Sequence, residues 1–422
     1  MIHNREQHIL EEYFCPSVPI SYAIEITYNC VNNCLACANI WNKKKNISLK
    51  RWRELFDKIC PPDNRKKYVQ AIRITGGEPT LHKELKQIVE YIDTFGIDHA
   101  LFTTAMWTSD KVKEIIDIYS TCKHFAGFLV SLHGSTQEAH NAFTRGSSSA
   151  FHTIRNNIKS LTNVGYVVFT NTVLTRYSCI QVEEMINLSQ KLGANHTVFN
   201  RLLGINQEIN PTNKQLIDSV TLIEKLKKEG VNCSVGNCVP KCFVSNTGEG
   251  ATGGIEHCAI SPAGDVRPDN LTNLIFGNIF EHSIEEIWQS DKAVFFRNST
   301  PDECYECLEF QRCRGGVKSV MIENKLDKDP LMRNPIKELE VEEIILDPEY
   351  IPIRNFEIRK EKNKYLLARY NWTMYASEEE IEVIKAIDGN NTLSCIQQKY
   401  GDDAINYIGE LYNDDFIQFQ KS

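Results

Sequence analysis

The chain has 422 residues, 42% of them hydrophobic and 24% charged, a composition typical of a globular protein with two or three domains. It contains no apolar run of about 18 residues, and its first residues, MIHNREQHILEEYF, lack the apolar core of a secretion signal. We therefore expect a cytoplasmic protein without a membrane anchor. Residues 341–422 hold 16 acidic against 9 basic residues and carry most of the net charge of −8, which argues against nucleic-acid binding.

Between residues 20 and 230, short runs rich in β-branched residues alternate with amphipathic stretches of ten or more residues. This alternation predicts an α/β fold with a parallel sheet, closed or nearly so, as in a partial (β/α)6 TIM-like barrel. In such folds the reactive groups gather on loops after the carboxyl ends of the strands. The predicted strands span 20–27, 71–74, 99–103, 125–132, 167–174 and 196–200, and the predicted helices span 48–60, 84–94, 109–119, 150–162, 182–192 and 212–229.

The pattern changes twice after residue 230. Residues 231–322 are rich in Cys, Gly and Pro and poor in apolar residues, so we expect a metal to hold their fold. After a charged linker, residues 341–422 show three strand-like runs, helices near 378–387 and 392–400, and a last helix before FIQF. The sequence therefore predicts three domains: 1–230, 231–322, and a small winged-helix-like α+β domain at 341–422.

Fifteen cysteines in a long chain without a secretion signal indicate metal or redox chemistry rather than disulfides. Cys30, Cys34 and Cys37 form the pattern C-x3-C-x2-C directly after the first predicted strand. Three thiolates on one loop are typical of a [4Fe-4S] cluster with one iron open to another ligand. A zinc site with a remote fourth ligand, or plain packing, is the alternative.

The second predicted strand ends in Gly76-Gly77-Glu78-Pro79. Two glycines let the backbone approach a ligand closely, and the carboxylate that follows is a potential acceptor for an ammonium group. Together with the three cysteines, this segment resembles the radical S-adenosylmethionine (SAM) superfamily over roughly residues 20–230. The resemblance implies that the open iron chelates the amino and carboxylate groups of S-adenosylmethionine, and that the segment from Gly76 to Pro79 holds the amino group.

The resemblance also implies contacts to S-adenosylmethionine further along the chain. Ser131, in SLHG, and Arg145, in AHNAFTRG, resemble the family positions that touch the ribose and the carboxylate, and Asn171 is a further candidate. An ordinary loop serine and a surface arginine are the alternatives. Three positions depart from the usual residues: Ala36 replaces an aromatic, His133 replaces the aspartate of SLDG, and Ala105 replaces an asparagine.

A second group of cysteines contains Cys304-x2-Cys307-x5-Cys313, preceded by CAISPAGDVRPDN from Cys258. It resembles the SPASM extension, whose cysteines bind auxiliary iron–sulfur clusters in peptide-modifying radical enzymes. Two expected ligand positions hold other residues, since Asp269 follows Gly264-x4 and Val317 ends the CGGC-like segment.

One auxiliary cluster is therefore our preferred count. The expected ligands are Cys304, Cys307 and Cys313 with one of Cys238, Cys242 or Cys258, while Asp269 is a candidate oxygen ligand of a second cluster. A zinc ribbon built from the same cysteines is the alternative.

The last 80 residues resemble, in pattern more than in motif, a PqqD-like leader-peptide recognition domain. Such a domain captures a precursor peptide as an added edge strand. The acidic surplus favours a leader with Lys or Arg. A winged-helix module that only stabilises the protein is the alternative.

These resemblances predict a radical SAM peptide maturase that forms a 5'-deoxyadenosyl radical and abstracts hydrogen from a ribosomally made precursor peptide, giving a cross-link, a thioether or an inverted centre. The expected partners are the precursor peptide and an electron donor such as flavodoxin or ferredoxin. A radical enzyme acting on a small molecule or folded protein, and a non-enzymatic zinc-stapled binding protein, are the alternatives. No acid, base or hydrogen donor can be assigned from the sequence, although Tyr22, Glu25, Asn200 and Arg201 lie at strand positions that face a potential cavity.

Overall fold

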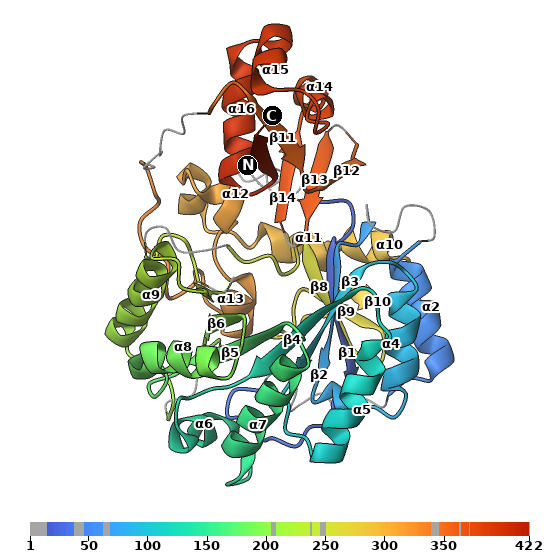
Figure 1. Ribbon diagram of the computed structural model, residues 1–422, viewed down its shortest axis with the longest axis vertical. Coiled ribbons are helices and arrows are strands. Elements are labelled where there is room, and N and C mark those ends of the chain that lie inside the picture. Colours follow the sequence, from blue (N-terminus) through green and yellow to red (C-terminus); the bar gives the residue numbers. More distant parts are fainter. Residues whose placement is uncertain are drawn as a thin grey trace.

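The computed structural model describes residues 15–37, 46–61, 68–203, 208–236, 239–244, 250–338, 346–362, 364–370 and 372–421. Its largest part is a parallel sheet covered by helices, and a smaller domain formed by the end of the chain stands above it in Figure 1. Within these described ranges, no helix is long and apolar enough to cross a membrane.

The parallel sheet contains every strand predicted between residues 20 and 230, in chain order. Its strands are β1 (Ser21–Thr27), β2 (Ala71–Gly76), β3 (Asp98–Thr103), β4 (Phe125–Ser131), β5 (Val168–Leu174), β6 (His196–Arg201) and the unpredicted β7 (Cys233–Val235). The helices are α2 (Leu49–Ile59), α4 (Leu85–Asp93), α5 (Ser109–Ser120), α6 (Gln137–Thr144), α7 (Ala150–Asn163), α8 (Val182–Lys191) and α9 (Asn213–Lys228), of which only α6 was not predicted. The α/β prediction is thus confirmed.

The burial pattern of β5 shows how the sheet is oriented. Thr170 and Thr172 are buried on the helix-covered face, whereas Phe169 is exposed and Asn171 half-buried on the opposite face. Alternate residues of a strand point to opposite faces, so the inner face of the partial barrel is accessible along this strand. Side chains at these inward positions are therefore available to a bound molecule.

The cysteine-rich segment adds three strands to the same sheet. β8 (His257–Ile260) pairs parallel with β1, and the antiparallel strands β9 (Asp265–Arg267) and β10 (Gly277–Asn278) follow it outward. Trp288, in α10 (Ile284–Trp288), is fully buried in the core that the barrel and this segment share. Apolar packing, and not a metal alone, therefore holds this part of the chain, which differs from the expectation for residues 231–322. The segment also contains α11 (Asp291–Asn298), α12 (Phe310–Cys313) and α13 (Lys318–Glu323).

The end of the chain forms an α+β domain with its own apolar core. Its described residues form two small antiparallel sheets, β12–β13–β14 and β11–β15, and thus contain five strands where three were expected. Their bounds are β11 (Tyr350–Arg354), β12 (Glu357–Lys360), β13 (Tyr365–Arg369), β14 (Trp372–Ala376) and β15 (Ile417–Lys421), and the helices are α14 (Glu378–Ala386), α15 (Leu393–Tyr400) and α16 (Asp402–Asn413).

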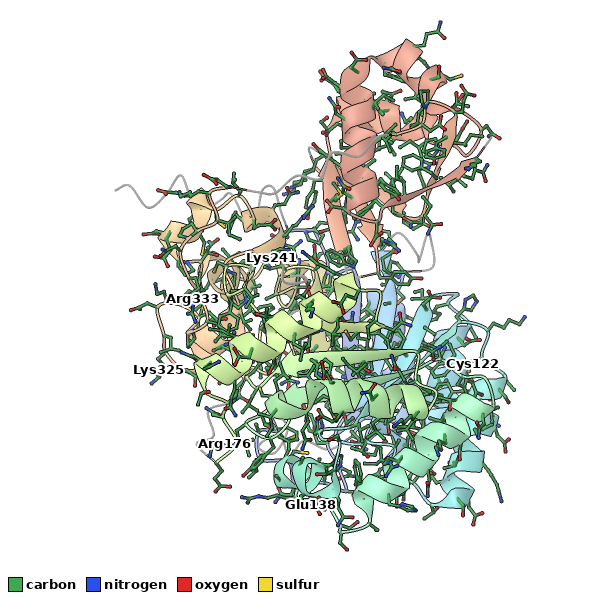
Figure 2. All side chains as sticks on the ribbon, turned by 60° about the vertical axis from the view of Figure 1, so that its left-hand side comes forward. Cys122, Glu138, Arg176, Lys241, Lys325 and Arg333 are labelled. Atoms are coloured by element: carbon green, nitrogen blue, oxygen red, sulfur yellow. The ribbon has the colours of Figure 1, made fainter. Side chains whose placement is uncertain are left out.

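This C-terminal domain is docked on the rest of the protein. Leu366 and Ala368 of β13 pack on Ile20 at the start of β1. The Arg314 guanidinium and the Thr373 hydroxyl both donate to the buried carboxylate of Glu256. Figure 2 shows the domain projecting from the rest of the protein. Its orientation is thus set by buried contacts and not by a linker alone.

Candidate active site and auxiliary metal site

Cys30, Cys34 and Cys37 lie on the loop that follows β1. Cys30 is exposed and the other two are half-buried. Burial, together with the charges of the nearby Cys37 and Cys30 thiols, raises the pKa of Cys34 to about 12. Three thiols that interact in this way repel one another when ionised, unless a positive group lies between them. The loop therefore fits an iron cluster chemically.

Helix α6, which the sequence did not reveal, supports this loop. The backbone N–H groups of Asn33 and Leu35 donate to the carbonyls of Thr144 (3.2 Å) and Phe143 (3.0 Å). These are carbonyls of the last turn, which a helix cannot satisfy by itself. Arg145 ends α6 in the left-handed region, with φ 48°, and its half-exposed side chain pairs with Glu208 at 2.8 Å. Helix α6 has only eight residues, fewer than the amphipathic stretches of ten or more on which the helix prediction rested, which explains why it was missed.

The turn at Gly76 and Gly77 packs directly against the chain that leads into the cysteine loop. The N–H groups of Gly77 and Glu78 donate to the carbonyls of Thr27 and Asn29, each at 2.7 Å. A Cβ atom at Gly76 would collide with the Thr27 carbonyl, and one at Gly77 with the backbone of Asn29. The two glycines are thus needed because the backbones that follow β1 and β2 approach each other closely at the carboxyl ends of these strands.

The carboxylate of Glu78 is held by neighbouring residues. It is buried and accepts hydrogen bonds from the hydroxyls of Thr80 (2.6 Å), Thr103 (2.8 Å) and Thr104 (2.8 Å), and from the Thr104 N–H (2.7 Å). These hydrogen bonds connect the end of β2 to the end of β3. Pro79 begins the short helical turn Pro79–Leu81 and is buried.

Ser131 and Asn171 lie opposite each other on β4 and β5, on the accessible inner face. The Asn200 amide of β6 donates to the Asn171 side-chain oxygen at 2.6 Å. These three polar side chains form a row across neighbouring strands at their carboxyl ends. Such a row is suited to hydrogen-bond a polar ligand in the barrel.

His133, at the position of the usual aspartate, fixes the loop after β4 as a neutral acceptor. The Nδ1 atom of His133 accepts from the Val173 backbone N–H at 3.1 Å. The backbone N–H of His133 donates to Nδ1 of His140, also at 3.1 Å. Burial lowers the pKa of His133 to about 3 and that of His140 to about 4. Ala105 takes φ 50°, a conformation that asparagine adopts more easily, and its carbonyl accepts from the Asn157 amide.

Four thiols line one pocket in the cysteine-rich segment: those of Cys242, Cys304, Cys307 and Cys313. Burial, together with the charges of the other three thiols, raises the pKa of Cys304 to about 12, while the nearby Lys318 opposes this rise. Two sulfurs also accept backbone hydrogen bonds, Cys242 from Arg333 N–H (3.2 Å) and Cys307 from Ile336 N–H (3.3 Å). Of the two candidates for a fourth thiol within the described residues, Cys242 and Cys258, Cys242 is the one that lines this pocket.

The remaining candidates lie elsewhere. Cys258 is fully buried on β8, opposite Tyr22 of β1, inside the apolar core. The carboxylate of the half-buried Asp269 accepts from the Ser319 hydroxyl and from the Leu271 N–H (2.8 Å). Neither residue therefore joins the four thiols. Cys238 lies outside the described residues.

The distances between thiols differ between an iron–sulfur cluster and a single zinc ion. Tetrahedral zinc brings its thiolates to roughly 3.8 Å from one another. Across the described chain, Asp93, His99 and Cys122 are the only set of three potential ligand atoms within 4.8 Å of one another. No three described thiols of either cysteine group are therefore arranged as a closed zinc site in this structure. A [4Fe-4S] cluster, in which each thiolate binds a different iron, does not require thiols that close.

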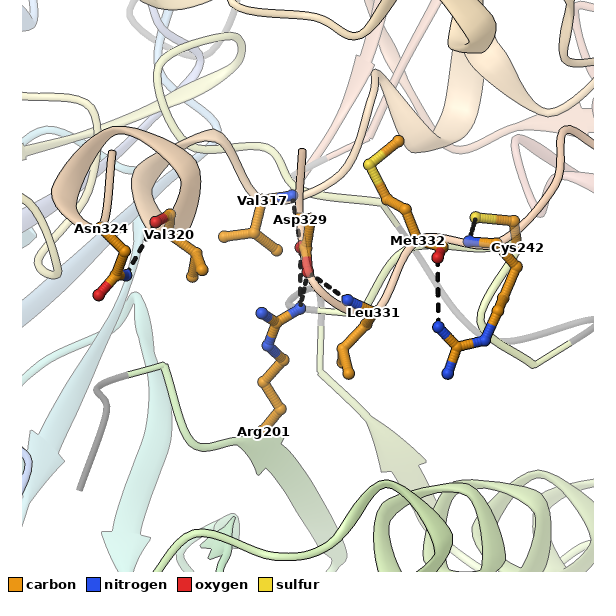
Figure 3. A network of polar contacts seen from close by, with 9 residues as sticks. Arg201, Cys242, Val317, Val320, Asn324, Asp329, Leu331 and Met332 are labelled. Carbon is orange, nitrogen blue, oxygen red and sulfur yellow. Dashed lines mark hydrogen bonds and ion pairs between the residues drawn. The ribbon is translucent and has the colours of Figure 1, made fainter. Parts of the chain in front are cut away.

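An ion pair connects the barrel to the segment around the auxiliary pocket (Figure 3). Arg201, the last residue of β6, donates to both oxygens of the fully buried Asp329 at 2.9 and 2.8 Å. Asp329 also accepts from the N–H groups of Val317 and Leu331. The next residues, Met332 and Arg333, line the pocket. The end of β6 is thereby linked to the pocket wall.

Two family models match the chain. The radical SAM superfamily matches residues 24–189, and SPASM, described as an iron–sulfur cluster-binding domain, matches residues 252–309. The chain contains a radical SAM domain followed by a SPASM domain. Its cofactors are accordingly a [4Fe-4S] cluster with S-adenosylmethionine and at least one auxiliary iron–sulfur cluster, as the sequence predicted.

Curated relatives cover most of the chain. The PqqA peptide cyclase of Bradyrhizobium diazoefficiens is 24% identical over 70% of this chain and 82% of the relative. The mycofactocin maturase MftC of Mycolicibacterium smegmatis is 23% identical over 71% of this chain and 78% of the relative. Both alignments are long enough to include the two domains together.

Among solved structures, SuiB of Streptococcus suis bound to S-adenosylmethionine superposes with a TM-score of 0.61 at 17% identity, covering 78% of this chain and 81% of that one. The enzyme anSMEcpe with bound AdoMet gives a TM-score of 0.55 at 15% identity, over 71% of this chain and 88% of that one. At these identities the likeness concerns the fold.

Proposed function

We propose that the protein is a radical SAM peptide maturase, which abstracts a hydrogen atom from a ribosomally synthesised precursor peptide through a 5'-deoxyadenosyl radical. The observation that carries the proposal is the kind of relative that aligns over both domains: a PqqA peptide cyclase and a mycofactocin maturase. SuiB, which shares the fold, has also been solved with its precursor peptide SuiA. The bond that is formed stays undetermined.

In this proposal Cys30, Cys34 and Cys37 hold the radical SAM cluster, which supplies one-electron cleavage of S-adenosylmethionine when it is bound. Gly76 and Gly77 bring the backbone close to the cluster loop, and Arg145 stands next to the helix end that supports this loop. Ser131 and Asn171 hydrogen-bond the cofactor or the substrate from the inner face. Cys242, Cys304, Cys307 and Cys313 hold one auxiliary cluster, and an external donor such as flavodoxin or ferredoxin delivers electrons.

The three domains are assigned to residues 1–230, 231–322 and 341–422, and the last is proposed to be a PqqD-like leader-recognition domain. Its sheet offers the two edge strands β12 and β14 for pairing with an extended peptide. Three glutamates begin α14 and two aspartates begin α16. This acidic surface favours a leader with Lys or Arg.

The test is the mass of a candidate precursor peptide, encoded by a short reading frame beside the gene, after anaerobic incubation with iron-loaded enzyme, S-adenosylmethionine and dithionite. Peptide maturation predicts a loss of two mass units, or uptake of one deuterium at an inverted centre in D2O. The C30A variant serves as the inactive control. Formation of 5'-deoxyadenosine without any change in the peptide would instead favour a small molecule or a folded protein as the substrate.

Leader recognition is tested without truncation, because removal of the C-terminal domain would expose Ile20 and the carboxylate of Glu256. The exposed residues Glu379 and Asp403 are replaced together by lysine, and exposed Glu138, outside the domain, is replaced as a control. We expect the E379K/D403K variant to bind a basic leader at least tenfold more weakly, measured by fluorescence anisotropy. Equal affinity in both variants would contradict the charge argument while leaving the maturase proposal intact.

A further inference from the structure

Lys318, at the start of α13, places a buried ammonium group beside the auxiliary pocket. Its side chain is 2% exposed, and Nζ donates to the Thr300 hydroxyl (2.6 Å) and to the Arg314 carbonyl (2.7 Å). Both acceptors are neutral, and in the described part of the chain no carboxylate forms an ion pair with Lys318. Because burying an unpaired charge is costly, an ammonium in this position needs an anionic partner.

The nearest candidates for that partner are the thiols of the auxiliary pocket. The Lys318 ammonium interacts electrostatically with Cys304 and Cys313. Gly315 lines the pocket, and a Cβ atom built on it would lie 3.2 Å from Lys318 Nζ. The ammonium therefore sits directly behind the pocket wall, where a longer residue than glycine would crowd it.

Arg314, the chain neighbour of Gly315, is a second buried cation and is already neutralised. Its guanidinium pairs with the buried carboxylate of Glu256, on the side that faces the C-terminal domain. The charge of Lys318, by contrast, has only neutral acceptors among its hydrogen-bond partners in the described residues and lies against the pocket wall. Two of its three N–H groups are used by Thr300 and Arg314, which leaves one to donate to a sulfur acceptor.

We propose that Lys318 is the counter-ion of the auxiliary iron–sulfur cluster and sets its reduction potential. A cluster held by four thiolates is an anion, and its negative charge grows by one when it takes up an electron. A fixed positive charge behind the pocket stabilises the reduced form more than the oxidised form, so it raises the potential. Lys318 acts here as a positioning and tuning residue. The inference rests on the proposed ligands Cys242, Cys304, Cys307 and Cys313.

The experiment uses the full-length C30A/C34A/C37A variant, which retains only the auxiliary cluster, and follows its reduction by an EPR-monitored redox titration. In this background K318M removes the charge, K318R keeps it, and K225M removes an exposed lysine as a control. We expect K318M to lower the equilibrium constant for one-electron reduction at least tenfold, which is a shift of about 59 mV to lower potential. K318R and K225M are expected to stay within a factor of three of the parent.

The outcomes separate the inference from the assignment on which it rests. If the parent variant holds no iron, the ligand proposal fails before Lys318 is tested. An unchanged potential in K318M with full iron and sulfide content, or equal shifts in K318M and K318R, would overturn the counter-ion role. If K318M loses its iron while K318R keeps it, the positive charge is required and the inference stands. Loss of iron from both variants would show that the site needs the lysine side chain itself and not its charge.

Discussion

Glu25 on β1 and Arg267 on β9 form a buried ion pair between the radical SAM domain and the SPASM domain. The Tyr28 hydroxyl donates to the same carboxylate at 2.9 Å, two residues before Cys30. Burial raises the pKa of Glu25, while the charge of Arg267 and the hydrogen bond from Tyr28 oppose this rise. The start of the cluster loop is thus anchored to a strand 242 residues away in sequence.

Removing Arg267 should therefore destabilise the protein strongly. The R267M variant leaves the Glu25 carboxylate buried and unpaired, and the expected loss is about 3–5 kcal/mol of unfolding free energy. The E25M/R267M variant removes both charges and is expected to recover most of this loss. Denaturant unfolding under anaerobic conditions measures both variants. Equal losses in the single and double variants would mean that the pair contributes through packing alone.

Local patterning was sufficient to predict the barrel, because each strand and most helices carry a clear apolar period. The C-terminal helices were predicted for the same reason. The partners of Glu25 and Arg201 could not be predicted, since Arg267 and Asp329 come from distant segments and no local pattern marks such pairs. The order of the sheet was also hidden, because nothing in residues 257–278 indicates that β8 adds to β1.

The functional site was only partly predictable, again because some of its contacts join distant segments of the chain. The loop of Cys30, Cys34 and Cys37 follows from spacing, but the hydrogen-bond partners of Glu78 could not be predicted. Its hydrogen bonds to Thr103 and Thr104 arise where two strands end side by side, and this contact is visible only in the folded chain. Likewise, spacing could not choose among three candidate thiols for the auxiliary pocket.

The fourth auxiliary thiol gives a direct test of iron content. The C242A variant should lose the auxiliary cluster and fall from about eight to about four iron atoms per chain, as expected for two four-iron clusters. The C258A variant should keep its iron, because Cys258 packs in the core beside Tyr22. It should instead lose about 1 kcal/mol of stability from the smaller side chain. Iron and sulfide analysis of both variants measures the clusters. A loss of iron in C258A alone would show that Cys258, and not Cys242, is the fourth ligand.

The hydrogen bonds of Glu78, which connect the ends of β2 and β3, should be needed for the shape of the cofactor pocket. In E78Q, an amide NH2 group replaces one of the two oxygens that accept hydrogen bonds from Thr103 and Thr104. We expect the unfolding free energy to fall by about 1–3 kcal/mol. We expect the ends of β2 and β3 to loosen and the rate of 5'-deoxyadenosine formation to fall at least tenfold, while leader binding is unchanged. Exposed E90Q is the matched control. Full activity in E78Q would show that the turn at Gly76 and Gly77 keeps its shape without these hydrogen bonds.

The buried histidines His133 and His140 predict how stability depends on pH. Their folded pKa values, about 3 and about 4, lie below the ordinary value of 6.5. Between pH 6.5 and 4 the unfolded chain therefore binds protons that the folded chain does not. Stability is fully present above pH 6.5 and is lost as the pH falls, by at most about 1.4 kcal/mol per pH unit for each histidine.

Glutamine at position 140 tests this dependence, because its amide oxygen accepts a hydrogen bond from the His133 N–H but does not titrate. Between pH 7.5 and 5.5 the unfolding free energy of H140Q should fall less steeply than that of the parent, while the exposed H282Q control should keep the parent slope. Anaerobic denaturant titrations at four pH values provide the slopes. Identical slopes in H140Q and the parent would mean that His140 takes up its proton in the folded protein without strain, and that the loop after β4 is not held by neutral imidazoles.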